Sequence, residues 1–90
     1  ETTGFEPDAV EVFLGTNGVS LGQGFTTPDP EEAMVKALAA ARSQQTWVLA
    51  DSSKFDIVTA AVMLPLEGAE IVTDRLRDTR YLDHTSVKEV

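Results

Sequence analysis

Short apolar runs separated by polar turns make up most of this chain, and their spacing predicts an α/β fold. The central run is Thr46–Ala50, which is apolar in four of its five positions and has polar residues on both sides. A run this short and this apolar favours a buried parallel strand over a helix. Ala9–Leu14 is rich in β-branched and aromatic residues and predicts an earlier strand, while Glu70–Thr73 predicts a later one.

The clearest helix signal begins at Asp29. This residue can cap a helix, Pro30 suits the first helical position, and Glu32 is placed to complete a capping box. Apolar residues at helical spacing predict the stripe that packs on the sheet: Met34, Ala37, Leu38 and Ala41. Glu32 and Lys36 are predicted to pair on the opposite face. We expect this helix to run from about Pro30 to about Ser43.

The second half of the chain adds further elements. Ile57–Leu64 is ambiguous between strand and helix, and we favour a strand over its second half, ended by Pro65. Asp74 is placed to cap a short helix over Arg75–Leu82, and Val87–Val90 predicts a last strand. This order predicts a single α/β domain with a mostly parallel sheet flanked by helices, built on a β-α-β core.

Two polar segments follow the first and the central strand. Gly15–Gly24 contains four glycines, which permit tight turns and close approach of main-chain amides to a ligand, although their spacing matches neither a dinucleotide fingerprint nor a P-loop. Asp51–Lys54 follows the central strand directly. Ligands of open α/β sheets bind beyond the carboxyl ends of the strands. We therefore expect the two segments to outline one cleft.

The residue types in these segments suit an anionic, hydroxylated ligand. The Lys54 ammonium offers three donors to a phosphate or carboxylate, or it is simply a solvated lysine in a turn. Asp51 and Ser53 either orient Lys54 and accept ligand hydroxyls, or they cap the turn. Asn17-Gly18 is either part of the site or only a turn dipeptide.

Composition excludes several other classes of function. The 90 residues suffice for one small domain, and the net charge of −8 makes the chain alone a poor partner for nucleic acid. There is no cysteine for a disulfide, a thiolate metal site or a nucleophile, which suits a reducing cytoplasm. No apolar run approaches the ~20 residues of a membrane span. We expect no metal and no cofactor.

Four blocks of the sequence stand out together: Phe13–Ser20, Gly24–Asp29 with Glu32, Ala33 and Lys36, Leu49–Phe55, and Ile71–Asp74. In this order and spacing they resemble the C-terminal effector-sensing domain of DeoR-family bacterial transcriptional repressors. The resemblance implies a Rossmann-like fold akin to ribose-5-phosphate isomerase and glucosamine-6-phosphate deaminase. It also implies a cytoplasmic sensor of phosphorylated sugars. The sequence around Gly15–Gly18 looks most like that of regulators of fructose or related sugar use.

Within this resemblance we expect the phosphosugar to contact seven residues. They are Gly15, Thr16, Asn17, Gly18, Asp51, Ser53 and Lys54. The alternative is a working sugar-phosphate isomerase or deaminase. Related deaminases carry Asp, Gly and His in the glycine loop, whereas Asn17, Gly18 and Val19 stand here. Because an amide cannot act as the base and valine cannot relay a proton, we favour a binding protein without catalysis.

The resemblance covers about the second half of a sensor domain. The N-terminal helix-turn-helix of family members and the first half of the sensor domain have no counterpart here, so we treat residues 1–90 as one partial effector-sensing domain that meets DNA only through another domain. Strand one would then have an unpaired apolar edge, and such edges are templates for pairing with another chain. We expect self-association.

Overall fold

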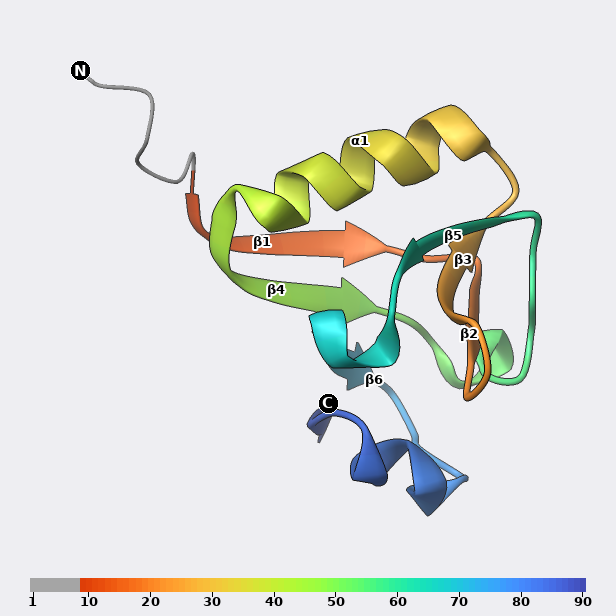
Figure 1. Cartoon of the computed structure of the whole chain (residues 1–90). Coiled ribbons are helices and arrows are strands. Elements are labelled where there is room, and N and C mark those ends of the chain that lie inside the picture. Colours follow the sequence, from red (N-terminus) through yellow and green to blue (C-terminus); the bar gives the residue numbers. More distant parts are fainter. Residues whose placement is uncertain (1–8) are drawn as a thin grey trace.

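A parallel sheet of four strands forms the centre of the computed structural model, which describes residues 9–90 (Figure 1). The strands lie in the order β1-β4-β6-β7, and their bounds are Ala9–Gly15 for β1, Ser43–Leu49 for β4, Glu70–Thr73 for β6 and Val87–Glu89 for β7. All neighbouring pairs run parallel. The predicted parallel strands are confirmed, and β4 begins three residues earlier than the apolar run at Thr46 indicated.

A second sheet, which the sequence analysis missed, follows directly after β1. It is antiparallel, in the order β2-β3-β5, with bounds Gly18–Ser20, Gly24–Thr27 and Ala61–Leu64. Interpreting Gly15–Gly24 as one irregular loop was therefore wrong, whereas the strand expected in the second half of Ile57–Leu64 is confirmed. Gly24 has φ +81°, and a Cβ there would lie 2.4 Å from the Leu64 carbonyl oxygen. Its lack of a side chain lets β3 approach the end of β5.

Helix α1 (Pro30–Ala41) connects the second sheet to β4 and packs against strands of both sheets. Its start is as predicted, with Pro30 at the first position and Asp29 Oδ1 accepting from the Glu31 amide at 2.9 Å. The capping box is not formed, because the Glu32 carboxylate contacts Thr27 and Lys36 instead.

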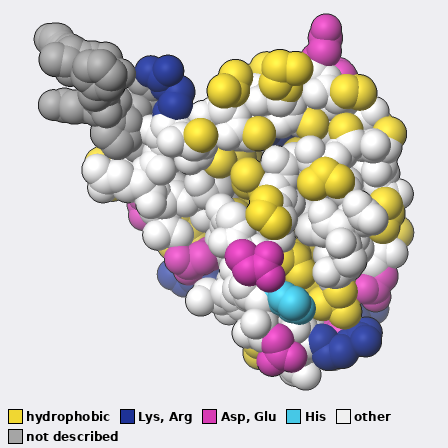
Figure 2. Space-filling view, viewed as in Figure 1, with side chains coloured by type: hydrophobic (Ala, Val, Ile, Leu, Met, Phe, Trp, Pro, Cys, Tyr) yellow, Lys and Arg dark blue, Asp and Glu magenta, His cyan; other side chains and the backbone are white. Residues whose placement is uncertain are grey.

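The predicted apolar stripe of α1 was wrong. Met34 and Leu38 are 63% and 57% exposed, and Ala33 is the buried residue of the helix. The helix lies on the sheets through small residues, because alanine allows the closest approach, and the larger side chains point outward. Figure 2 shows hydrophobic side chains gathered over α1 at the top of the view.

The core lies between α1 and the two sheets. Strand residues that point towards the helix, such as Val48 and Ile71, are fully buried. The opposite face of the parallel sheet carries Phe13, which is 57% exposed and stacks on Trp47 with ring centroids 6.4 Å apart. Helices were expected to flank the sheet, but within residues 9–90 there is one α-helix, and it covers one face.

Beyond β6 the predicted helix over Arg75–Leu82 was also wrong in its bounds and cap. A 3-10 helix, η3, spans Thr79–Asp83, and Asp78 caps it by accepting from the Arg80 amide at 3.0 Å. Asp74 accepts instead from the Ser52 amide at 2.7 Å. No helix within residues 9–90 combines the length and hydropathy that crossing a membrane requires.

Candidate functional site

The turn after β1 is fastened to β3. The Thr16 hydroxyl is buried and lies 3.0 Å from both the Gly18 and the Thr26 carbonyl oxygens, and the Asn17 amide donates to the Thr26 carbonyl at 3.1 Å. Gly18 then starts β2, where it pairs with Thr26. The predicted role of Thr16 as a ligand contact competes with this buried backbone role, which already uses its one hydroxyl proton.

Side chains from β3 and α1 complete this turn. The Thr27 hydroxyl lies 3.2 Å from Asn17 Oδ1 and 3.2 Å from Glu32 Oε1. The Lys36 ammonium donates to the Gly15 carbonyl at 2.8 Å and to Glu32 Oε1 at 3.0 Å. The Glu32–Lys36 pair was predicted, but on the face of the helix away from the sheet. It lies instead at the carboxyl end of β1.

The turn after β4 is fastened to β6. The Ala50 amide donates to the Val72 carbonyl at 3.0 Å, and Asp74 holds the Ser52 amide. Asp51 caps the short 3-10 helix η1 (Ser52–Lys54), with Oδ1 accepting from both the amide and the hydroxyl of Ser53. Asp51 and Ser53 therefore do form the predicted cap.

Hydrogen bonds also set the ionisation of this turn. The hydroxyl and then the amide of Ser53, with a smaller effect from the Lys54 ammonium, hold the pKa of Asp51 below its ordinary value. The Ser52 amide does the same for the pKa of Asp74. Among residues 9–90 the Lys54 side chain forms neither a hydrogen bond nor an ion pair, and its backbone amide donates to the Asp51 carbonyl.

The segment that follows the turn after β1 runs beside the segment that follows the turn after β4. Val19 and Phe55 form a parallel bridge, and the Asp56 amide donates to the Val19 carbonyl at 2.6 Å. A Cβ on Gly18 would lie 2.3 Å from the Ile57 carbonyl oxygen. The two segments are thus neighbours in space, although within the described chain no hydrogen bond or ion pair joins Gly15–Gly18 directly to Asp51–Lys54.

Tyr81 of η3 contacts both of these segments, one at Val19 and the other at Asp56. It is fully buried, and its hydroxyl donates to Asp56 Oδ1 at 2.9 Å and lies 3.2 Å from the Val19 carbonyl. Burial, followed by the neighbouring Asp56 carboxylate, raises the pKa of Tyr81 to about 12. Asp56 itself has φ +65°, a left-handed conformation that non-glycine residues seldom adopt.

The matching family model is that of the DeoR C-terminal sensor domain, and it covers residues 6–75. This range includes both turns and the start of α1. The chain belongs to this family. The resemblance seen in the sequence is therefore confirmed, and the chain is a sensor domain of transcriptional regulators.

A curated relative agrees with this assignment. FruR, an uncharacterized HTH-type transcriptional regulator of Bacillus subtilis (strain 168), is 42% identical over 81 residues, which are 87% of this chain and 32% of the relative. The matched part of this chain thus spans about a third of the length of that regulator.

Two hollows of the sensor domain lie at the carboxyl ends of β4 and β6. One, of about 390 Å³, is lined by residues that include Leu49, Asp51 and Asp74. The other, of about 160 Å³, lies behind the second turn and includes Ser52 and Arg77. Neither is lined by Gly15–Gly18, and within residues 9–90 no three His, Asp or Glu side chains gather to hold a metal ion.

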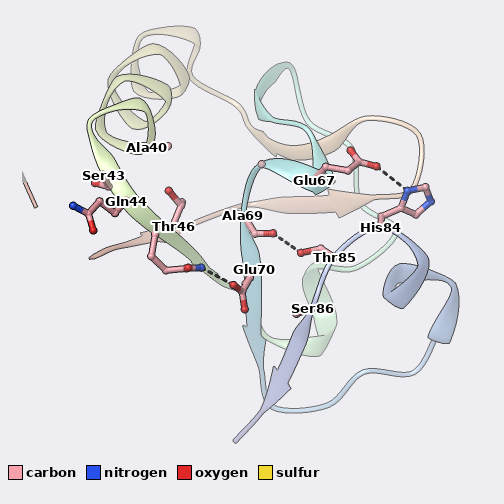
Figure 3. Close-up of a pocket in the computed structure, with 12 residues that line it drawn as sticks. Ala40, Ser43, Gln44, Thr46, Glu67, Ala69, Glu70, His84, Thr85 and Ser86 are labelled. Carbon is pink, nitrogen blue, oxygen red and sulfur yellow. Dashed lines mark hydrogen bonds and ion pairs between the residues drawn. The ribbon is translucent and has the colours of Figure 1, made fainter. Parts of the chain in front are cut away.

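A third hollow, of about 410 Å³, lies at the opposite edge, beside the amino ends of β4 and β6 (Figure 3). Its carboxylates are already paired: Glu67 Oε2 accepts from His84 Nδ1 at 2.9 Å, and Gln45 Nε2 donates to Glu70 Oε2 at 2.7 Å. The contact with His84 holds the pKa of Glu67 below its ordinary value. Because ligands of such sheets bind at the carboxyl edge, we do not place the site here.

Three neighbours of the first turn were not predicted from the sequence: Thr27, Glu32 and Lys36. The available signal was the i,i+4 spacing of Glu32 and Lys36, together with their place in blocks shared with the family. That spacing identifies the pair but does not show which way the pair faces.

Proposed function

We propose that this sensor domain binds a phosphorylated sugar at the carboxyl edge of its parallel sheet and thereby controls operator binding by the regulator to which it belongs. Family membership gives the class, a sensor of a small effector. The observation that carries the choice of site is that the chain leaving the turn after β1 runs beside the chain leaving the turn after β4, with Val19 and Phe55 bridged.

In this proposal the ligand contacts the seven residues named from the sequence. Main-chain amides of Gly15–Gly18 and the Asn17 side chain address hydroxyls or the phosphate, and the Lys54 ammonium supplies positive charge. Asp51 and Ser53 orient that lysine or accept sugar hydroxyls. Support comes from the hollow of about 390 Å³ beside Asp51 and from the exposed position of Asn17.

We further propose that binding is not followed by catalysis. The site offers an amide at Asn17 and an apolar side chain at Val19, which is fully buried, where proton transfer beside a carbonyl needs a positioned acid and base. Incubation with aldose and ketose phosphates should therefore give no interconversion. Isomerisation abolished by Lys54→Ala would instead support the enzyme alternative.

A thermal-shift panel tests the binding proposal. We expect one or more of glucose 6-phosphate, fructose 6-phosphate, fructose 1-phosphate and ribose 5-phosphate to raise the melting temperature. A ligand at 100 times its Kd adds about 2.7 kcal/mol of stability. A fructose phosphate is the favoured member, since the sequence around Gly15–Gly18 resembles regulators of fructose or related sugar use. No shift with any sugar phosphate would indicate a domain that serves assembly alone.

We also propose that the domain self-associates and that the regulator is cytoplasmic and meets its operator through a separate DNA-binding domain. Support for self-association is that, within residues 9–90, β1 lies at the edge of the parallel sheet and pairs with β4 alone. Light scattering should give a mass above that of one chain at high concentration, and a monomer at every concentration would contradict it.

A further inference from the structure

Lys36 is the best-positioned cation at the carboxyl end of β1. Its ammonium has three protons, and two are used by the Gly15 carbonyl at 2.8 Å and Glu32 Oε1 at 3.0 Å. No third partner exists among residues 9–90. The side chain is 22% exposed, so one donor remains for a ligand while the other two hold the ammonium in place.

Glu32 provides an acceptor beside this donor. Its Oε1 lies close to both the Lys36 ammonium and the Thr27 hydroxyl, and its Oε2 has no partner among residues 9–90. Thr27 in turn reaches Asn17 Oδ1. One chain of contacts therefore joins Asn17, Thr27, Glu32 and Lys36, which come from the turn after β1, the end of β3 and helix α1.

We propose that Lys36 and Glu32 are ligand-binding residues of the effector site, with the Lys36 ammonium contacting an anionic oxygen and Glu32 Oε2 accepting a neighbouring hydroxyl. This inference rests on the proposed function and adds two residues to its site. The ligand class that fits the pair is a phosphorylated polyol, because an anion alone leaves the carboxylate unsatisfied and repelled.

Preorganisation explains why Lys36 should contribute more than Lys54. Ordering a free lysine side chain costs conformational entropy, and a contact formed by a side chain that is already fixed avoids most of that cost. Lys36 is fixed by two contacts, whereas the Lys54 side chain has none within the described chain.

A structural role alone is the competing explanation, since Lys36 also fastens Gly15 to α1. The two roles differ in what they predict for the ligand. A residue that only holds the turn would leave the preference among ligands unchanged, whereas a residue that contacts the hydroxyl and phosphate changes it.

The test titrates the wild-type chain and three variants, Lys36→Met, Lys54→Met and Lys88→Met, with the sugar phosphate that gives the largest shift in the panel above. Lys88 lies exposed on β7 and is the matched control. We expect Lys36→Met to weaken binding at least about tenfold, the loss typical of one charged hydrogen bond. Lys54→Met should weaken it less, and Lys88→Met should leave it unchanged.

Glu32→Gln supplies a second, independent readout. Titration with inorganic phosphate alongside the sugar phosphate gives a preference ratio, and we expect this ratio to fall at least about threefold in Glu32→Gln. In the wild-type chain, the Lys36 ammonium signal in a nitrogen-15 NMR titration should move more than that of Lys88, a result that does not depend on any variant folding.

Each outcome is decisive. No binding of any sugar phosphate by the wild-type chain contradicts the proposed function itself. Wild-type binding with Lys36→Met within about twofold of it, or an unmoved Lys36 ammonium signal, overturns the role of Lys36 while leaving the proposed function in place. An unchanged preference ratio in Glu32→Gln overturns the role of Glu32.

Discussion

The turns after β1 and β4 lie at the same edge of the parallel sheet, yet they are held in different ways. The turn after β1 is fastened by elements far along the chain, with Thr26 and Thr27 from β3 and Lys36 from α1. The turn after β4 is capped by its own residues, because Asp51 accepts from Ser53 two positions on. Two backbone amides also join it to β6 and the residue that follows β6, Ala50 to Val72 and Ser52 to Asp74.

This difference matters for how each lysine can act. The ammonium of Lys36 is positioned by tertiary contacts, whereas Lys54 sits on a three-residue 3-10 helix that fixes its backbone and leaves its side chain unconstrained. Sequence position alone favoured Lys54, which follows a strand directly. The fold favours Lys36, which the helix carries back to the end of β1.

The largest expected effect comes from breaking the contact between the chains that leave the two turns. A Cβ on Gly18 would lie 2.3 Å from the Ile57 carbonyl oxygen and 2.7 Å from Thr26 Oγ1. Gly18→Ala should therefore destabilise the fold by about 3 kcal/mol in urea unfolding.

Gly22→Ala is the matched control for this substitution, since nothing lies within 4 Å of a Cβ at that position. It should change stability by less than about 0.5 kcal/mol. Equal effects of the two substitutions would show that β2 and the Phe55–Ile57 segment are not in close contact.

Tyr81 joins the same two runs through a side chain, and its removal should have the next largest effect. Tyr81→Phe loses the hydroxyl that contacts Asp56 and the Val19 carbonyl, with an expected cost of about 1–2 kcal/mol at pH 7. Thermal unfolding of the two proteins measures this cost.

The stability difference between wild type and Tyr81→Phe should also depend on pH in a predictable direction. The pKa of Tyr81 is raised from 10.0 to about 12, so the folded chain holds the proton more tightly than the unfolded one. Its contribution to stability is full below pH 10 and is lost as the pH rises towards 12. The difference in stability between wild type and Tyr81→Phe should shrink over that range, and a constant difference would contradict the assignment.

The two lysines should differ in the absence of ligand as well. Lys36→Met removes contacts to Gly15 and Glu32 and should cost about 1 kcal/mol, a value reduced by the partial exposure of the pair. Lys54→Met should change stability by less than about 0.5 kcal/mol. Chemical denaturation of both variants checks the comparison, and a larger loss in Lys54→Met would reverse it.

The sequence predicts the parallel strands and the start of α1 because their signals are local. A short apolar run between polar residues and an Asp-Pro cap need no information from distant parts of the chain. The helix face was mispredicted because α1 has apolar residues on two sides. Met34 and Leu38 were placed on the packing face, but packing against two sheets selects the small residue Ala33 and leaves these larger side chains exposed.

The second sheet and half of the candidate site escaped prediction for a similar reason. β2 has only three residues, and it is stabilised by pairing with β3 rather than by its own propensity. The polar turns were located correctly at the strand ends. Which helix residue reaches them depends on the rotation of α1, which the i,i+4 spacing of Glu32 and Lys36 does not determine.

The smallest expected effect comes from removing the Ser53 hydroxyl, which contacts Asp51 within the turn after β4. The Ser53 hydroxyl, ahead of its amide, lowers the pKa of Asp51 below its ordinary 3.8, so the cap is stabilising above that pH and is lost as the pH falls through the lower, folded value. In Ser53→Ala the pKa of the Asp51 carboxyl, followed by carbon-13 NMR, should rise towards 3.8, because only the Ser53 amide and the weaker effect of the Lys54 ammonium remain to stabilise the charge. The pKa of Asp74, set first by the Ser52 amide, should stay unchanged and is the internal control. If both values moved together, the turn after β4 would depend on β6 as strongly as the turn after β1 depends on β3, and the contrast between the two turns would not hold.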